Sequence, residues 1–281
     1  MALVNSAHNE EKKLPAAWSA LQIGSRTISE YLPPRWHRRP AGKILNLLGV
    51  KSDVDAVLAR IPRPDVIWIY NAYAYEALFL RELLRRGTEG EKPRIVLEIE
   101  DWPLARLRKG HPKPWLDWAG LRYVLKRADA VFCVNEALAS KVRRERPEVS
   151  VHVLPGLVDD AILKLHRESP PFQGDGPLRI GYFGGLSEEK GAGLLLEAIA
   201  ASSDREWEWI VSGGGPMGAE FVENAKRYPR LRFYGMVSDE ELVRLMGICD
   251  VIINPHRPIS EMGDGVFPFK VVESVATGRL V

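Results

Sequence analysis

Short apolar runs alternate with longer amphipathic segments along most of the chain. The run VIWIY at 66–70, for example, is followed by EALFLRELLRR at 76–86, in which apolar residues recur every three or four positions. Short strands separated by helices of about 10–15 residues predict βαβ units and a parallel sheet. The pattern appears twice, which predicts an α/β fold of two Rossmann-like domains. Strands are expected at 64–71, 94–101, 129–135, 149–155, 178–185, 208–215, 231–237 and 250–255. Helices are expected at 53–61, 75–87, 115–128, 136–146, 192–202, 218–228 and 239–248.

A segment rich in Pro, Gly and Ser interrupts this rhythm between residues 155 and 177, where it includes ESPPFQGDGP. Such a composition predicts a linker between domains. The expected organisation is therefore a domain at 1–154, a linker at 155–177 and a second domain at 178–281. The first 50 residues hold short helical patches broken by prolines, without a clear opening strand. Ligands are expected in a cleft between the domains, outside the carboxyl ends of the strands.

Composition and charge narrow the class of protein. No apolar stretch approaches the roughly 20 residues that span a bilayer, and the N-terminus lacks the pattern of a signal peptide, so we expect a cytoplasmic protein. Cys133 and Cys249 lie in apolar runs and the six histidines are scattered, so no metal site is expected. Residues 1–150 carry 26 Lys and Arg against 18 Asp and Glu, a balance of +8, whereas the rest carries 13 against 19, a balance of −6. The basic first half is expected to face something anionic.

Glycines stand at the carboxyl ends of two predicted strands. Gly184 and Gly185 lead into a polar loop that brings Lys190 to the start of a helix, and three further glycines occupy 213–215. Glycines let a ligand approach the backbone, and a helix N-terminus attracts anions. This arrangement suits a diphosphate, with a tight turn and a solvated lysine as the alternative.

The closing segment repeats the arrangement. Glycines at 263 and 265 precede an apolar helix beginning near Pro268, which carries Lys270 and Glu273 on one face. An internal i,i+3 ion pair is the simpler interpretation, worth about 0.2–0.5 kcal/mol. A carboxylate here could instead accept both hydroxyls of a ribose while phosphates sit at the helix start.

These elements together resemble a known family. The run from Leu178 to Val281 resembles the donor-binding domain of retaining glycosyltransferases of the GT-B fold, family 4 (glycosyl transferases group 1). The matching elements stand in order as YFGGLSEEKG, IVSGGGP, RFYGMVSDEEL, CDVIINP and FPFKVVESVATGRLV. In the first half, RADAVFCVNEAL and VHVLPGLVDDAI resemble the end of the family's acceptor domain.

The resemblance implies a metal-independent enzyme that moves a sugar from a UDP- or GDP-linked donor to a hydroxyl acceptor, with no other cofactor. Lys190 would contact the diphosphate, Glu273 the ribose, and the backbone at Met236 and Val237 the base. The implied donor-binding residues are Gly184, Gly185, Lys190, Gly213, Gly214, Gly215, Met236, Val237, Gly265, Val266, Phe267, Lys270 and Glu273. The expected catalytic residues are Lys190, Glu100 and Asp101.

The chain departs from the family's pattern in three ways. An arginine that often precedes the phosphate-binding lysine is replaced by Gly185, and an earlier glutamate would fall at Gly265. The family's opening strand with its Gly-rich loop and its closing helix are not found, so we expect a chain trimmed at both ends. This leaves an alternative function, a weak or inactive nucleotide-sugar-binding remnant that acts with a partner chain.

Two segments of the first half carry further candidate chemistry. Glu98, Glu100 and Asp101 cluster at the end of a strand and could touch sugar or acceptor; a metal-binding triplet and a solvated strand end are the alternatives. Residues 104–127 combine basic side chains with Trp115 and Trp118, which suits an anionic membrane surface. The family resemblance adds the expectation of a lipid-linked acceptor at the inner membrane face, as in surface polysaccharide or glycolipid synthesis. A solvated helix with core tryptophans is the alternative there. No nucleic-acid motif accompanies the basic residues.

Overall fold

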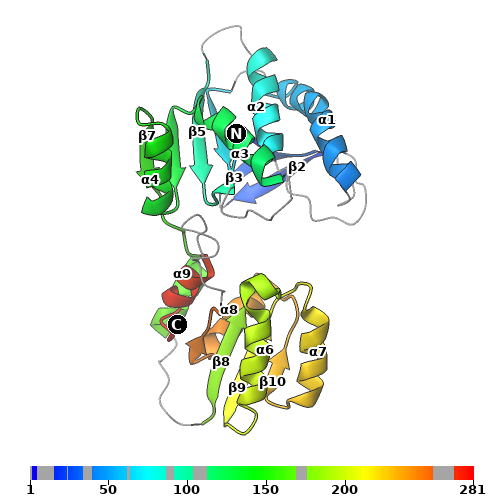
Figure 1. Ribbon diagram of the computed structural model, residues 1–281, viewed down its shortest axis with the longest axis vertical. Helices are drawn as coiled ribbons and strands as arrows, with labels where there is room; N and C mark the ends of the chain where they lie inside the picture. Colours follow the sequence, from blue (N-terminus) through cyan, green and yellow to red (C-terminus); the bar gives the residue numbers. More distant parts are fainter. Residues whose placement is uncertain are drawn as a thin grey trace. The chain divides into compact units, whose positions relative to one another are not determined.

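The computed structural model describes most of the chain as two compact units (Figure 1). The first runs up to Pro155, and the second takes in the described residues from Gly156 onward. The described residues are 2–4, 16–23, 25–33, 40–61, 64–86, 92–103, 113–168, 176–255 and 269–281, with backbone alone at 2, 23, 40–46 and 166–168. None of the helices in these ranges is long and apolar enough to cross a membrane.

The first unit is built on a parallel sheet whose strand order, β4-β5-β6-β7, follows the chain. Its strands are β4 (Val66–Tyr70), β5 (Arg94–Ile99), β6 (Ala130–Cys133) and β7 (Ser150–Val153). The connecting helices are α2 (Ala74–Arg86), α3 (Lys113–Leu125) and α4 (Glu136–Glu145).

The strand order places these helices on one face of the sheet. Connections between neighbouring parallel strands turn right-handed, so strands added in one direction put every connecting helix on the same side. Figure 1 looks onto the face that carries α3 and α4. Along β5 the burial alternates accordingly, with Ile95, Leu97 and Ile99 buried and Val96 and Glu98 only partly so.

The first 50 residues form strands that the sequence analysis did not predict. Strands β1 (Ala2–Val4), β2 (Ala17–Ile23) and β3 (Arg26–Leu32) make a separate sheet of order β1-β3-β2, in which β2 and β3 are antiparallel. Helix α1 (Pro40–Leu58) follows and starts well before the expected residue 53. The strands were not predicted because polar residues interleave with the apolar ones along β2 and β3. Helix α1 can start at Pro40 because the N–H groups of the first helical turn make no hydrogen bond within the helix, so proline is tolerated there.

A buried carboxylate joins this region to the rest of the unit. Asp53 on α1 accepts hydrogen bonds from the Tyr31 hydroxyl at 2.9 Å and from the Tyr75 hydroxyl at 2.8 Å. Burial together with the Asp53 charge raises the pKa of both phenols. Asp53 therefore satisfies two tyrosine hydroxyls that bring β3 and α2 against α1.

The second unit has a parallel sheet of order β10-β9-β8-β11. Its strands are β8 (Leu178–Phe183), β9 (Trp207–Ser212), β10 (Leu231–Phe233) and β11 (Val251–Ile252). Its helices are α6 (Ala192–Ala201), α7 (Gly218–Arg227), α8 (Asp239–Ile248) and α9 (Phe269–Ala276), with a 3₁₀ turn η2 (Glu188–Lys190) ahead of α6.

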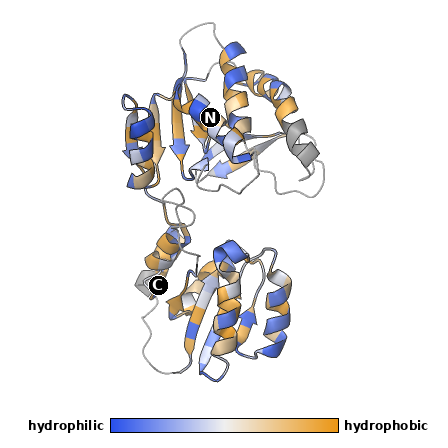
Figure 2. Ribbon diagram, in the orientation of Figure 1, coloured by the Kyte–Doolittle hydropathy of each residue, from blue (hydrophilic) through white to orange (hydrophobic). Residues whose placement is uncertain are grey.

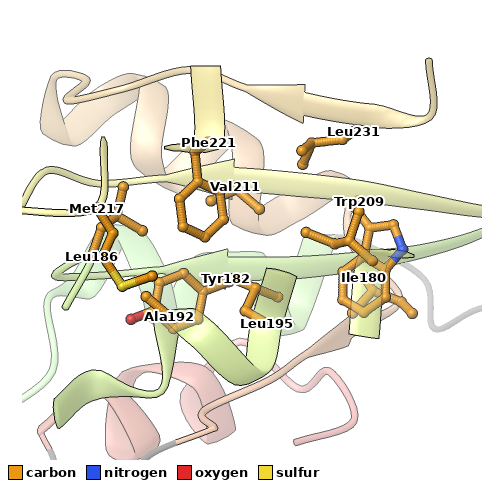
Figure 3. Close-up of a cluster of buried hydrophobic side chains, with 11 residues drawn as sticks. Ile180, Tyr182, Leu186, Ala192, Leu195, Trp209, Val211, Met217, Phe221 and Leu231 are labelled. Atoms are coloured by element: carbon orange, nitrogen blue, oxygen red, sulfur yellow. The ribbon is translucent and has the colours of Figure 1, made fainter. Parts of the chain in front are cut away.

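Both faces of this second sheet carry a hydrophobic core, because the chain reverses direction across the sheet after β10. One cluster includes Tyr182, Leu195 and Phe221, and Figure 3 shows these side chains packed between the sheet and its helices. The other cluster includes Leu245 and Ile252. Figure 2 shows that these helices carry both apolar and polar residues. The two cores fix the strand ends from which the candidate site is built.

The predicted linker contains a helix. Helix α5 (Asp160–Glu168) lies within 155–177, belongs to the second unit and packs against α8 and α9. Ile162 is buried and Leu165 joins the core cluster of α8. Ile162 and Leu165, spaced i,i+3 in DAILKLHRE, carry this packing, but the surrounding Pro and Gly obscure the helical pattern in the sequence.

Candidate functional site

Three glycine-containing loops meet at the carboxyl edge of the second sheet, and we call them the glycine edge: residues 184–186, 213–215 and 235–237. The N–H of Gly184 donates to the Ser212 carbonyl at 2.9 Å, and the N–H of Gly213 donates to the Gly235 carbonyl at 2.8 Å. The Ser212 hydroxyl donates to the same Gly235 carbonyl at 2.8 Å. Backbone thus packs on backbone along this edge.

Two of these positions leave no room for a side chain. A Cβ on Gly213, which has φ +154°, would lie 1.7 Å from the Gly184 carbonyl oxygen. A Cβ on Gly215 would lie 2.4 Å from the Leu186 carbonyl oxygen. The glycines that suggested a ligand site from the sequence are therefore also required for the loops to pack on each other.

Lys190 lies at the end of η2, next to the glycine edge. Gly191 follows it in the left-handed conformation, with φ +76°, and begins α6. The Lys190 Cγ lies 3.7 Å from where a Cβ on Gly185 would be. Among the described residues no carboxylate forms an ion pair with Lys190. Its ammonium is thus available to an anion at the start of α6.

Lys270 reaches the same edge from α9. Its ammonium donates to the Phe183 carbonyl at 2.8 Å and lies 2.8 Å from the Cβ position of Gly184. Burial of the ammonium, with repulsion from Lys190, lowers the pKa of Lys270, against the opposing attraction of Glu273. The i,i+3 ion pair considered above does not form between these two described residues. Two cations are therefore gathered beside Gly184 with one nearby carboxylate.

The remaining predicted donor residues fall into two groups. Met236 and Val237 follow β10, and Met236 is among the most exposed apolar side chains, with its sulfur 3.1 Å from the Cβ position of Gly214. Gly265, Val266 and Phe267 lie outside the described residues. Glu273 is on α9, one turn after Lys270.

Glu100 and Asp101 follow β5 in the first unit, where a buried asparagine holds their backbone. The Asn71 side chain accepts from the N–H of Glu100 at 3.0 Å and from that of Asp101 at 3.4 Å. Asn71 itself has φ +48° and donates its N–H to the Glu98 carbonyl at 2.9 Å. The Tyr70 hydroxyl donates to the Glu100 carboxylate. The turn after β5 is thus fixed by two residues of the neighbouring strand end.

The environment of Glu100 makes its carboxylate a stronger proton acceptor than an ordinary glutamate. Burial raises the pKa of this carboxyl, and the charges of Glu98 and Asp101 add to the effect, although the Tyr70 and Asn71 hydrogen bonds oppose it. Glu98 accepts from the Trp68 indole N–H at 2.9 Å. These three carboxylates, all described, do not converge as metal ligands, and no group of three acidic, His or Cys side chains does so elsewhere in the described part of the chain.

Sequence reasoning missed Tyr70, Asn71 and Ser212 because each becomes significant only through its neighbour across the sheet. Asn71 had one usable signal, since it directly follows an apolar strand, where asparagine tolerates a left-handed backbone. Ser212 stands immediately before the three glycines, a second signal of the same kind. Tyr70 gave no such signal, because its contact with Glu100 depends on the register of β4 against β5.

Comparison with protein families assigns both halves. A glycosyl transferase 4-like domain matches residues 14–156, and a glycosyl transferases group 1 domain matches residues 177–281. The chain belongs to the family 4 glycosyltransferases. The family prediction made from the closing segments is confirmed. No curated protein sequence matches the chain.

Solved structures confirm the GT-B fold. Sucrose-phosphate synthase from Thermosynechococcus elongatus is 15% identical with a TM-score of 0.62, and the match covers 99% of this chain and 69% of that one. HepE of Anabaena, in complex with UDP and glucose, is 18% identical with a TM-score of 0.58, covering 90% and 66%. The lipopolysaccharide outer core galactosyltransferase WaaB is 15% identical with a TM-score of 0.53, covering 90% and 64%. The chain spans about two thirds of the length of these proteins.

Proposed function

We propose that this glycosyltransferase moves a sugar, with retention of configuration, from a nucleotide-diphosphate sugar to a hydroxyl acceptor, and that it needs no metal ion. The observation that carries the proposal is the pair of lysines, Lys190 and Lys270, that approach the loop of Gly184 and Gly185. Two cations next to a helix start match the charge of a diphosphate.

Glu273 supports the nucleotide assignment. It lies one turn beyond Lys270 on α9, so that a diphosphate held by the lysines would leave the ribose hydroxyls within its reach. Met236, exposed at the end of β10, borders the same edge on the side of the base. UDP is the first nucleotide to test because one relative, HepE, was solved in complex with UDP.

The transfer needs charge stabilisation more than covalent chemistry. The bond from the sugar C1 to the diphosphate oxygen breaks, its electron pair leaves with the diphosphate, and the acceptor oxygen forms the new bond to C1. The lysines stabilise the leaving diphosphate. We propose that the Glu100 carboxylate accepts the proton of the acceptor hydroxyl, because burial and its acidic neighbours raise the pKa of Glu100. Asp101 is the second carboxylate that we place at the acceptor.

Calorimetric titration with UDP and GDP, in EDTA and then with Mg²⁺, tests the donor site. Lys190→Ala and Glu273→Ala should each weaken binding about 10- to 100-fold, since hydrogen bonds to charged groups contribute about 1.5–3 kcal/mol. Lys226→Ala is the matched control, because Lys226 is exposed on α7 and pairs with Glu223 at 2.7 Å. Binding that needs Mg²⁺, or that the first two variants leave unchanged, would refute the assignment.

Turnover separates this proposal from its alternative. The chain spans about two thirds of its solved relatives, which keeps open a nucleotide-sugar-binding protein that acts through a partner chain. Incubation with the bound sugar nucleotide and an acceptor decides between them: a product whose anomeric configuration by ¹H NMR equals that of the donor supports a retaining transferase. Tight binding without product by the chain alone supports the alternative.

A lipid-linked acceptor at the inner membrane face is the finer part of the proposal. Trp115 and Leu116 are exposed on the first turn of α3, and Arg122, Lys126 and Arg127 are exposed toward its other end. Trp118 instead packs against Trp102, with ring centroids 5.1 Å apart, so it is not part of this surface. The basic residues of 104–112 lie outside the described residues. The fraction of protein that sediments with phosphatidylglycerol vesicles should be lower for Trp115→Ser than for the wild type, and it should drop to zero at high salt.

A further inference from the structure

The sheet of the first unit has an apolar face that none of the helices in the described part of the unit covers. On β4, Val66, Trp68 and Tyr70 are 54%, 52% and 53% exposed, although Ile69 between them is buried. They share one face with Glu98 of β5, Phe132 of β6 and His152 of β7, to which the strand register aligns them. We call these six residues the open face. Parallel sheets are normally covered on both faces, so an aromatic face left open marks a surface that binds something.

Three aromatic rings form a ridge across the open face. Trp68 stacks on Phe132 with centroids 5.1 Å apart and 16° between planes, and Phe132 stacks on His152 at 5.3 Å and 28°. Because the rings stack on one another, the faces of Phe132 are already occupied. The ridge therefore presents ring edges, which suits packing against aliphatic side chains better than stacking against a flat sugar or base.

One carboxylate within this apolar surface has no cationic partner. Glu98 accepts a hydrogen bond from Trp68, which is neutral, and among the described residues neither Lys nor Arg forms an ion pair with it. Covering the open face would bury this charge, and a buried carboxylate is strongly unfavourable unless a cation accompanies it. A partner that covers the face must therefore bring Lys or Arg.

We propose that the open face is the docking surface for an amphipathic helix of a partner protein, with an aliphatic stripe against the aromatic ridge and a Lys or Arg against Glu98. A helix is the element that covers the faces of parallel sheets, and an amphipathic helix presents an apolar stripe to them. A second copy of the chain is disfavoured because a two-fold pairing would set two Glu98 carboxylates together near the middle of the interface. An anionic lipid surface would meet the same repulsion.

The test uses two fluorescein-labelled 18-residue peptides with Leu at the same helical spacing, one with Lys and one with Glu on the polar face. Fluorescence anisotropy measures their binding to the folded chain and to Trp68→Ser and Glu98→Gln. Trp115→Ser is the matched control, because Trp115 is equally exposed but lies on α3. Circular dichroism confirms that each variant is folded, and UDP titration confirms that the donor site is unaffected, which keeps this test separate from the proposed transfer activity.

We expect the Leu/Lys peptide to bind at least tenfold more tightly than the Leu/Glu peptide. Trp68→Ser should weaken that binding at least tenfold, Glu98→Gln should remove the preference for Lys, and Trp115→Ser should change neither. The proposal is overturned if the folded chain binds neither peptide, or if Trp115→Ser weakens binding as much as Trp68→Ser. It is also overturned if sedimentation equilibrium finds a dimer that Trp68→Ser dissociates, since the face would then hold a second copy.

Discussion

Replacing Gly213 by alanine should disrupt the glycine edge more than alanine at any other glycine of that edge. The new Cβ would lie 1.7 Å from the Gly184 carbonyl oxygen and 2.8 Å from its carbonyl carbon, so one of the two loops must move. Alanine at φ +154° costs about 1–3 kcal/mol by itself. The shift also strains the bonds from Gly184 to Ser212, at 2.9 Å, and from Gly213 to Gly235, at 2.8 Å, each worth about 1 kcal/mol. We expect the free energy of unfolding to fall by about 3–5 kcal/mol.

The assay is urea denaturation followed by circular dichroism, with and without UDP. The chain has two units, so the relevant transition is the one that bound nucleotide shifts to higher urea. Gly218→Ala is the control: nothing lies within 4 Å of its Cβ position, and it opens α7, so it should be neutral or stabilising by up to about 1 kcal/mol. If Gly213→Ala unfolds at the same urea concentration as the Gly218→Ala control and keeps its affinity for UDP, the packing described for this edge is wrong.

Three further predictions concern the ionisable groups of Asp53, Lys270 and the two cysteines. Asp53→Ala should lower the free energy of unfolding by about 2–4 kcal/mol in urea melts, because it leaves the Tyr31 and Tyr75 hydroxyls without their acceptor; a loss no larger than that of Tyr75→Phe would contradict this. Because the pKa of Lys270 is lowered, its ammonium loses its proton earlier than an ordinary lysine as pH rises. As pH rises toward the range in which an ordinary lysine titrates, UDP affinity should therefore decline by more in the wild type than in Lys270→Met, and equal slopes would remove Lys270 from the phosphate site. Burial raises the pKa of the Cys133 and Cys249 thiols to about 12, so DTNB at pH 8 should label neither thiol until urea unfolds the chain; rapid labelling of the folded protein would show that one of them is accessible.

The sequence alone determined the regular part of the fold. Apolar runs of four to eight residues and amphipathic helices between them located β4 to β11, α2 to α4 and α6 to α8, often within two residues of their ends, because both periodicities are local properties of the chain. The family followed from ordered motifs around Lys190, Gly213 and Glu273. Where local signals conflicted, the sequence failed: prolines concealed the start of α1, and Pro and Gly concealed α5 between them.

Only the tertiary structure decided which residues act on one another. That Lys270 bonds the Phe183 carbonyl and not Glu273 depends on α9 packing against the end of β8, 87 residues earlier in the chain. Tyr70 and Asn71 reach Glu100 because β4 and β5 are neighbours in register. The exposure of Trp68 depends on all connecting helices lying on the other face. Contacts of this kind join residues far apart in sequence, and their free energy comes from packing that no local window contains.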